Sequence, residues 1–194
     1  MTVTRDKYLA ADELDHLRAT TQGAAGESAA AALRWLVVDV ALQTGLRVNE
    51  LCRISIGHIN LRARTLRVSR SKRKGGLQWE TVAMSPSLCG HLAQHMAELG
   101  SLHPEQPLFV GKRGPCTVRG LQQAWTRALE LAGLPTSVTI HGARHTLAVH
   151  LYGATKDLRL VQKQLGHASP ETTAEYYADV PFEAQLDALQ GVFG

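Results

Sequence analysis

The chain has 194 residues, of which 44% are hydrophobic and 20% are charged, and its net charge is +4. This length suits a single well-packed domain over residues 1–194. No apolar run approaches the roughly 18 residues that a membrane-spanning helix needs, so an integral membrane protein is excluded. Acidic residues precede any apolar segment at the N-terminus, which is unlike a secretory signal peptide, so we expect a cytoplasmic protein.

The first half of the chain is predicted to be helical and then to change periodicity. Residues 11–19 form a short amphipathic pattern, followed by a Gly/Ser/Thr-rich break. Residues 28–44 predict a mostly buried helix, with Gly45 where a C-cap glycine belongs. Residues 47–54 predict a further short helix.

A β-hairpin is predicted next, because apolar and polar residues alternate on both sides of a turn. Residues 65–70 would pair with residues 79–84, with Gly75 and Gly76 near the tip. This hairpin carries a basic cluster without a single acid. A polyanion such as nucleic acid would suit the cluster, and a merely solvated hairpin is the alternative. Its members are Arg62, Arg64, Arg67, Arg70, Lys72, Arg73 and Lys74.

Helical patterns with clear start and stop residues fill the second half. Serine, threonine and aspartate stand at predicted N-caps, and glycines stand at most predicted ends. The predicted helices cover residues 85–100, 117–132, 141–152, 157–165, 169–180 and 182–189. The fold class is therefore mainly α with a small antiparallel β-hairpin.

Two groups of potential metal or redox ligands predict neither kind of site. The three cysteines Cys52, Cys89 and Cys116 are far apart and form no CxxC pair, which favours reduced, buried thiols. His91 and His95 stand four residues apart, but HLAQH lacks the glutamate of a zinc-protease motif. We expect a solvent-facing or half-buried histidine pair, and no metal.

The segment 141–177 carries side chains suited to phosphate chemistry. His141, Arg144 and His145 fall on one helical face, where an arginine fork can bind two phosphate oxygens beside a histidine. His167 precedes a predicted helix start, which favours an anion. Tyr176 lies about two turns further on, and surrounding cations would favour its anionic, nucleophilic form.

Four ordered motifs resemble the signature boxes of the tyrosine recombinases, or phage integrase family. They are TGLRVNEL at 44–51, RSK at 70–72, HGARH at 141–145 and LGHASPETTAEYY at 165–177. Single boxes are weak signals, whereas the ordered set is highly specific. The resemblance spans residues 8–180, nearly the whole chain.

The resemblance implies a role for each matching residue. Lys72 would be the general acid and Tyr176, nine residues after His167, the nucleophile. The remaining catalytic positions are Arg47, His141, Arg144 and His167. Lys74 competes with Lys72 for the acid role, and Tyr177 competes with Tyr176.

Further residues are expected around the catalytic set. Glu50 matches an acidic neighbour of the first arginine and would orient it, and His145 would pack beneath the site. Arg70, Arg73 and Lys74 of the hairpin would bind DNA.

The implied activity is site-specific DNA recombination through a 3′-phosphotyrosyl intermediate, which needs neither ATP nor a metal and therefore no cofactor. The implied partners are double-stranded DNA, three further protomers on paired sites, and accessory proteins. A non-catalytic DNA-binding regulator and a nicking-closing enzyme of topoisomerase type are the alternatives. Most of the family carries an N-terminal clamp domain, which we do not expect in this chain because the similarity begins near Tyr8. The chain resembles short stand-alone members of the family, and a catalytic fragment of a longer protein is the alternative.

Overall fold

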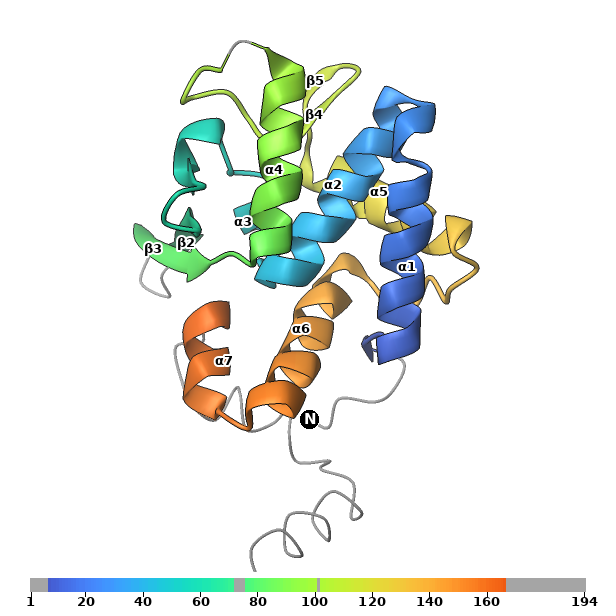
Figure 1. The fold of residues 1–194 in the computed structure, drawn as a ribbon, viewed down its shortest axis with the longest axis vertical. Helices are drawn as coiled ribbons and strands as arrows, with labels where there is room; N and C mark the ends of the chain where they lie inside the picture. The colour runs from blue at the N-terminus through green and yellow to red at the C-terminus, as the bar shows by residue number, and fades with distance from the viewer. Residues whose placement is uncertain (1–6, 72–75, 101, 167–194) are drawn as a thin grey trace, which may run out of the picture.

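The computed structural model describes residues 7–71, 76–100 and 102–166, and the side chain of Ser71 is outside this description (Figure 1). Helices dominate, as the sequence predicts. The α-helices are α1 (Ala11–Gly23), α2 (Ala29–Thr44), α3 (Val48–Leu51), α4 (Pro86–Leu99), α5 (Val118–Leu131), α6 (Ile140–Thr155) and α7 (Leu158–Leu165). The strands are β1 (Ile59–Asn60), β2 (Thr65–Ser71), β3 (Leu77–Ala83), β4 (Val110–Gly111) and β5 (Gly114–Pro115). Two 3₁₀ turns are η2 (Ala25–Glu27) and η3 (Ile56–His58).

Helix α2 is the central element, and α1, α5 and α6 pack around it (Figure 1). The Ser28 side chain accepts a hydrogen bond from the Ala31 N–H and so caps its start. Gly45 ends it in the left-handed conformation, with φ of 64°. The buried run Leu36–Leu42 explains why this helix is apolar on nearly every side.

The sheet has the strand order β1–β2–β3, and both pairings are antiparallel. Leu66 pairs with Val82 and turns to the core together with Val68, because alternate residues of a strand share one face. The predicted hairpin is confirmed. Strand β1 and the β4–β5 ribbon were not predicted, since two-residue strands carry too short an alternation.

The core is divided into two parts. The large cluster joins α2, α4, α5 and the inner face of the sheet. A smaller cluster of Ala148, Val161 and Leu165 holds α6 and α7 together. Helix α7 therefore belongs to a hairpin of helices with its own apolar contact, below the sheet in Figure 1.

Two helix ends differ from the sequence-based expectation. Helix α1 continues to Gly23 because Thr21 is buried and its hydroxyl donates to the Leu17 carbonyl within the helix. Helix α6 runs through Gly153, where a stop was expected, and ends at Lys156 with φ of 53°. A glycine within a helix costs only about 1 kcal/mol, which packing against α7 can offset. In the part of the chain that the structure describes, no helix is long and apolar enough to cross a membrane.

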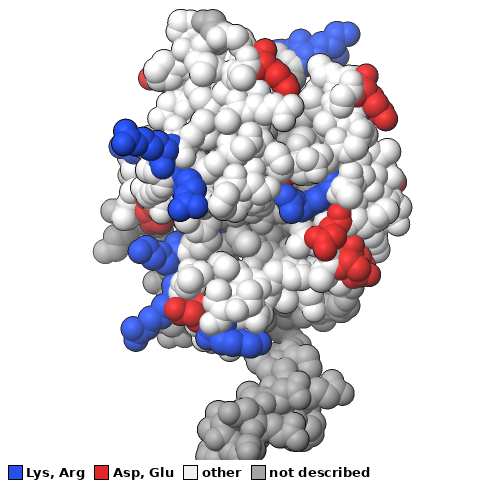
Figure 2. Space-filling view, in the orientation of Figure 1, with Lys and Arg blue, Asp and Glu red and all other residues white. Residues whose placement is uncertain are grey.

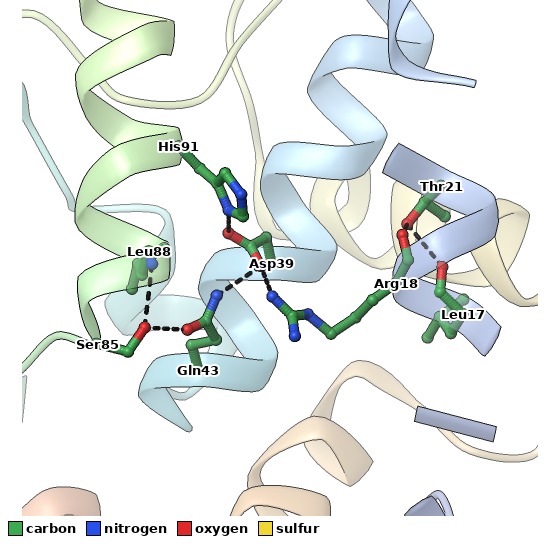
Figure 3. A network of polar contacts seen from close by, with 8 residues as sticks. All are labelled: Leu17, Arg18, Thr21, Asp39, Gln43, Ser85, Leu88 and His91. Atoms are coloured by element: carbon green, nitrogen blue, oxygen red, sulfur yellow. Dashed lines mark hydrogen bonds and ion pairs between the residues drawn. The ribbon is translucent and has the colours of Figure 1, made fainter. Parts of the chain in front are cut away.

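A buried carboxylate ties the first two helices to α4 (Figure 3). Asp39 of α2 is 1% exposed. It accepts hydrogen bonds from Arg18 at 3.1 Å and from Gln43 at 2.6 Å, and it lies 2.8 Å from Nδ1 of His91. His91 of the HLAQH sequence is therefore half-buried as expected, and its partner is this aspartate.

Replacing Asp39 with alanine is expected to lower the free energy of unfolding by about 2 kcal/mol, because a buried ion pair that loses one partner leaves the other charge uncompensated. Both partners are partly exposed, which reduces the cost. Chemical denaturation measures the change, with Asp15→Ala on the exposed face of α1 as the control. Equal stability of the two variants would contradict a structural role for Asp39.

Candidate active site

The corner between α2 and α3 presents the first predicted catalytic residue. Gly45 turns the chain and buried Leu46 anchors it, so that Arg47 becomes the N-cap residue of α3. Both oxygens of Glu50 bind Arg47, one accepting from its backbone N–H and the other from its Nη1, each at 2.9 Å. Glu50 is 5% exposed, whereas the Arg47 side chain is 46% exposed. The carboxylate thus holds a guanidinium whose outer part faces solvent. The orienting role of Glu50 in catalysis stays a prediction.

The start of α6 places His141, Arg144 and His145 beside that corner. Arg144 is 2% exposed, and its guanidinium bridges the C-terminal ends of helices α2 and α7. Nη1 donates to the Gly45 carbonyl and Nη2 to the Leu165 carbonyl, both at 2.8 Å. A guanidinium has five N–H donors, and these two bonds use two of them. Arg144 therefore connects the corner that carries Arg47 with the last residue of α7.

The two histidines of α6 stack edge to face, with ring centroids 4.8 Å apart. Partial burial lowers the pKa of His141, and the charges of Arg144 and Arg47 lower it further. His141 is exposed as a whole residue, but one part of its ring lies against His145 and is shielded from water there. This local loss of hydration explains why the pKa falls at an exposed residue. Because Arg144 bonds the Gly45 carbonyl two residues before Arg47, and His141 lies one turn before Arg144 on α6, the structure places these three residues at one corner.

His145 is less exposed than His141. Burial, followed by repulsion from His141, Arg144 and Lys7, lowers its pKa to about 4. The imidazole is therefore neutral near pH 7 and adds no charge to a site that already holds two arginines.

Arg70 is placed differently from the sequence-based expectation of a DNA-binding side chain. It is 5% exposed and points from β2 into the protein. Its Nη1 donates to the Leu165 carbonyl, and its Nε lies 3.0 Å from a Glu80 oxygen in an ion pair without a hydrogen bond. Burial lowers the pKa of the guanidinium, and the charges of Glu50 and Glu80 oppose that shift. The alternation of β2 turns Arg70 inward, so it is not on the surface where DNA would contact it.

The other predicted residues lie outside the described residues. They are Lys72, Arg73 and Lys74 of the hairpin, and His167, Tyr176 and Tyr177 with the C-terminal helices. The elements that precede them in the sequence are described: β2 precedes Lys72, and α7 precedes His167. The roles of these residues remain predictions.

Sequence reasoning missed the side chain that fastens α7 to the sheet. The Gln164 amide donates to the Ala83 carbonyl at 3.0 Å and accepts from the Ala83 N–H at 3.2 Å. This reciprocal pair extends the exposed edge of β3. No sequence signal marks it, because a glutamine in the last turn of a helix is ordinary.

Comparison with known proteins identifies the family to which the fold that carries these arginines belongs. The model of the phage integrase family matches residues 7–183, which is most of the chain. The chain belongs to the phage integrase family. Its core helices and hairpin have the fold of tyrosine recombinase catalytic domains.

Curated relatives in the family are similar over most of this chain. Tyrosine recombinase XerC of Mycobacterium leprae is 31% identical over 175 residues, which are 89% of this chain and 59% of that protein. XerC of Anoxybacillus flavithermus is 32% identical over 144 residues, covering 72% of this chain and 48% of the relative. The chain thus spans about half the length of the curated relatives that it matches.

Solved structures of the family share the fold. The XerA recombinase matches with a TM-score of 0.77 and 25% identity, over 96% of this chain and 65% of that one. The XerH recombinase bound to palindromic difH substrate, a post-cleavage complex, matches with a TM-score of 0.76 and 24% identity, over 96% and 53%.

The charge of this integrase-family domain is uneven (Figure 2). Much of the lysine and arginine surface in this view lies along the edge that the hairpin and α7 occupy in Figure 1. Arg62, Arg64 and Arg67 of the predicted basic cluster are exposed, as is Arg159 of α7. This edge favours a polyanion. Within the described ranges, no group of three or more metal-ligating side chains is close enough to hold an ion.

The lowered histidine pKa predicts acid sensitivity. Below pH 6.5 the unfolded chain binds a proton at His145, whereas the folded protein binds it only near pH 4. The stability that this residue contributes is therefore fully present above pH 6.5 and is lost as the pH falls toward 4. We expect about 2 kcal/mol of loss between pH 6.5 and 4 from this residue, reduced for its partial exposure. Denaturant titrations of wild type and His145→Gln measure it. A variant with an equally steep pH profile would contradict the assignment.

Proposed function

We propose that this chain is the catalytic part of a site-specific DNA recombinase that cuts and rejoins strands through a tyrosine. One observation carries the proposal: Arg144 donates to the carbonyl of Gly45, two residues before Arg47, so that two arginines 97 residues apart in the sequence lie at one corner with His141. Two guanidiniums beside a neutral histidine suit a phosphodiester, whose developing charge needs fixed donors. The family membership supports the same reaction.

The proposed reaction begins with attack of the Tyr176 oxygen on the scissile phosphorus. The phosphorus–O5′ bond breaks, and a 3′-phosphotyrosyl bond forms. His141, whose lowered pKa keeps it neutral, accepts the phenol proton. Lys72 protonates the departing 5′ oxygen. Arg47, Arg144 and His167 neutralise the phosphoryl oxygens during the step.

Rejoining reverses these bonds with a different strand. A 5′-hydroxyl of a partner duplex attacks the phosphotyrosyl bond and releases Tyr176. The energy of the phosphodiester is retained in the covalent intermediate, so the cycle requires no ATP. Exchange of partners needs two DNA sites, and we propose four protomers on them. The relatives' structures support DNA as the partner, since XerH is bound to difH substrate and a λ integrase dimer is bound to a COC′ core site.

Covalent trapping without metal tests the proposal. Purified protein is incubated in a chelator with nicked suicide duplexes drawn from the DNA around its own coding region. We expect a protein–DNA band that survives denaturing electrophoresis. Binding of the uncut duplex should weaken steeply as salt rises, because each phosphate that a cation neutralises releases counterions.

The products distinguish this activity from its alternatives. Exchanged partner strands indicate a recombinase, whereas relaxed supercoils without exchange indicate a nicking-closing enzyme. Salt-dependent binding without any covalent band on cognate duplexes would contradict the proposal and indicate a regulator that binds DNA only.

A further inference from the structure

The end of α7 is attached to the sheet through polar contacts. Its apolar contact with α6 is the small cluster of Ala148, Val161 and Leu165, separate from the main core. A groove of about 590 Å³, lined by residues of α1, α2, β3, α6 and α7, lies beside the helix. The last turn of α7 is held to β2 and β3 by hydrogen bonds, whereas its buried Leu165 packs against α6.

Arg70 makes the most buried of these contacts. Its guanidinium donates to the carbonyl of Leu165 and, at 3.4 Å, to that of Gln164. These are C-terminal carbonyls of α7, which lack partners within the helix and carry its negative dipole end. Glu80 on the neighbouring strand pairs with the same guanidinium at 3.0 Å. Arg70 thus acts as a cationic C-cap that is supplied by a strand.

The same turn is reached from two other directions. Arg144 donates to the Leu165 carbonyl that Arg70 also binds. The Gln164 amide pairs with the backbone of Ala83 across the sheet edge. Helix α6, strand β2 and strand β3 therefore all meet at the last turn of α7.

Gly166 leaves space for the Arg70 guanidinium, which lies against it. Its φ of 65° lies in the left-handed region that favours glycine. A β-carbon built at this position would also collide with the Arg70 guanidinium. The glycine is thus required both by its backbone conformation and by the arginine that lies against it.

We propose that Arg70 is a positioning residue for strand cleavage, which sets the hairpin arm carrying Lys72 against the helix end that leads to His167 and Tyr176. The inference rests on the proposed function. Lys72 is two residues after Arg70, and His167 directly follows Gly166. The buried Arg70 guanidinium therefore lies where the strand that continues to the general acid meets the helix that continues to the nucleophile. A displacement of about 1 Å between such groups can cost about 100-fold in rate.

The test compares Arg70→Met with Arg67→Met. Both variants remove one positive charge from β2, but Arg67 is exposed and lies over the Trp79 ring, 4.7 Å from its centroid. Single-turnover cleavage is measured on an ordinary suicide duplex and on one with a 5′-bridging phosphorothiolate, whose leaving group needs no general acid. Arg67→Met is expected to bind DNA more weakly, because Arg67 is one of the exposed cations of the basic edge, whereas Arg70→Met should keep the wild-type affinity. Cleavage rates are therefore compared at saturating duplex. Arg70→Met alone should cleave the ordinary duplex about 100-fold more slowly, with a clearly smaller loss on the phosphorothiolate.

Equal rates for the two variants would overturn the proposal. So would a loss of the same size on both substrates, which indicates fewer folded molecules rather than a misplaced acid. Amide hydrogen exchange is measured in parallel and requires no activity. The Gly166 amide, bonded to the Gln162 carbonyl at 2.7 Å, should exchange faster in Arg70→Met and unchanged in Arg67→Met. Unchanged exchange of the Gly166 amide in both variants would refute the anchoring of α7 by Arg70, whether or not the wild type cleaves DNA. Absence of a covalent product from the wild type would instead count against the proposed function alone.

A double-mutant cycle keeps the proposal testable if Arg70→Met folds poorly. Gly166→Ala is measured in wild type and in Arg70→Ala by thermal unfolding. The backbone cost at φ 65° is the same in both backgrounds, whereas the collision with the guanidinium exists in one. We expect Gly166→Ala to lower the melting temperature more in the presence of Arg70. Equal shifts would show that the two residues are not coupled.

Discussion

Replacing Tyr176 with phenylalanine should abolish the covalent protein–DNA product while leaving DNA affinity nearly unchanged. The substitution removes one oxygen, the atom proposed to bond to phosphorus, and keeps the aromatic ring. Salt-dependent affinity comes from cations such as those exposed along β2 and α7, which the change does not touch. The expected loss is complete, because no other group in the proposed site can form a 3′-phosphotyrosyl bond.

Tyr177→Phe is the matched control for this prediction. Adjacent residues of a helix point about 100° apart, so only one of the two tyrosines can face the phosphate. The nine-residue spacing from His167 favours Tyr176. Denaturing gels with a suicide duplex score both variants alongside wild type. A band that persists in Tyr176→Phe and disappears in Tyr177→Phe would reassign the nucleophile.

Local signals predicted much of the fold, because helix ends are decided by one or two residues. Ser28, Ser85 and Thr117 each accept the capping hydrogen bond that their position predicts. Asp157 caps α7 in the same way, and Gly166 ends it in the left-handed conformation. The predicted hairpin likewise forms in an antiparallel register.

Tertiary contacts were beyond the reach of the same reasoning. Arg70 lies in a run of basic residues and was expected on the surface, yet the strand alternation and the carbonyls of α7 turn it inward. Gly153 was expected to end α6, but that helix continues to Thr155 and ends at the left-handed Lys156. For Arg70, a segment 95 residues away in the sequence supplies the deciding partner.

In the candidate site, too, the residues could be selected from the sequence, whereas their tertiary contacts could not. Resemblance to the family selected Arg47, His141 and Arg144, and the bond from Arg144 to the Gly45 carbonyl places them at one corner. The resemblance also placed Glu50 beside Arg47, and the two side chains form an ion pair. The binding of the Gly45 and Leu165 carbonyls by Arg144 was not expected, since backbone acceptors carry no side-chain signature.

Arg144→Lys is the second substitution for which we expect a large effect, on both cleavage and folding. A lysine ammonium is a single point donor without the planar fork, so it cannot bind the Gly45 and Leu165 carbonyls together and also serve a phosphate. Loss of one fixed donor to a developing oxyanion typically costs about 100- to 1,000-fold in rate. A buried carbonyl left without its partner costs about 1–3 kcal/mol in the free energy of unfolding.

The two effects are separable by temperature. Cleavage is measured well below the melting temperature of the variant, where circular dichroism shows it folded, and stability is measured by denaturant. Arg127→Lys on the exposed face of α5 is the matched control and should change neither quantity. If Arg144→Lys kept wild-type stability but lost cleavage, its bonds to the carbonyls would be incidental and its role purely chemical. If it lost stability but cleaved at the wild-type rate once folded, Arg144 would serve the framework alone, and the phosphate would be bound by Arg47 without it.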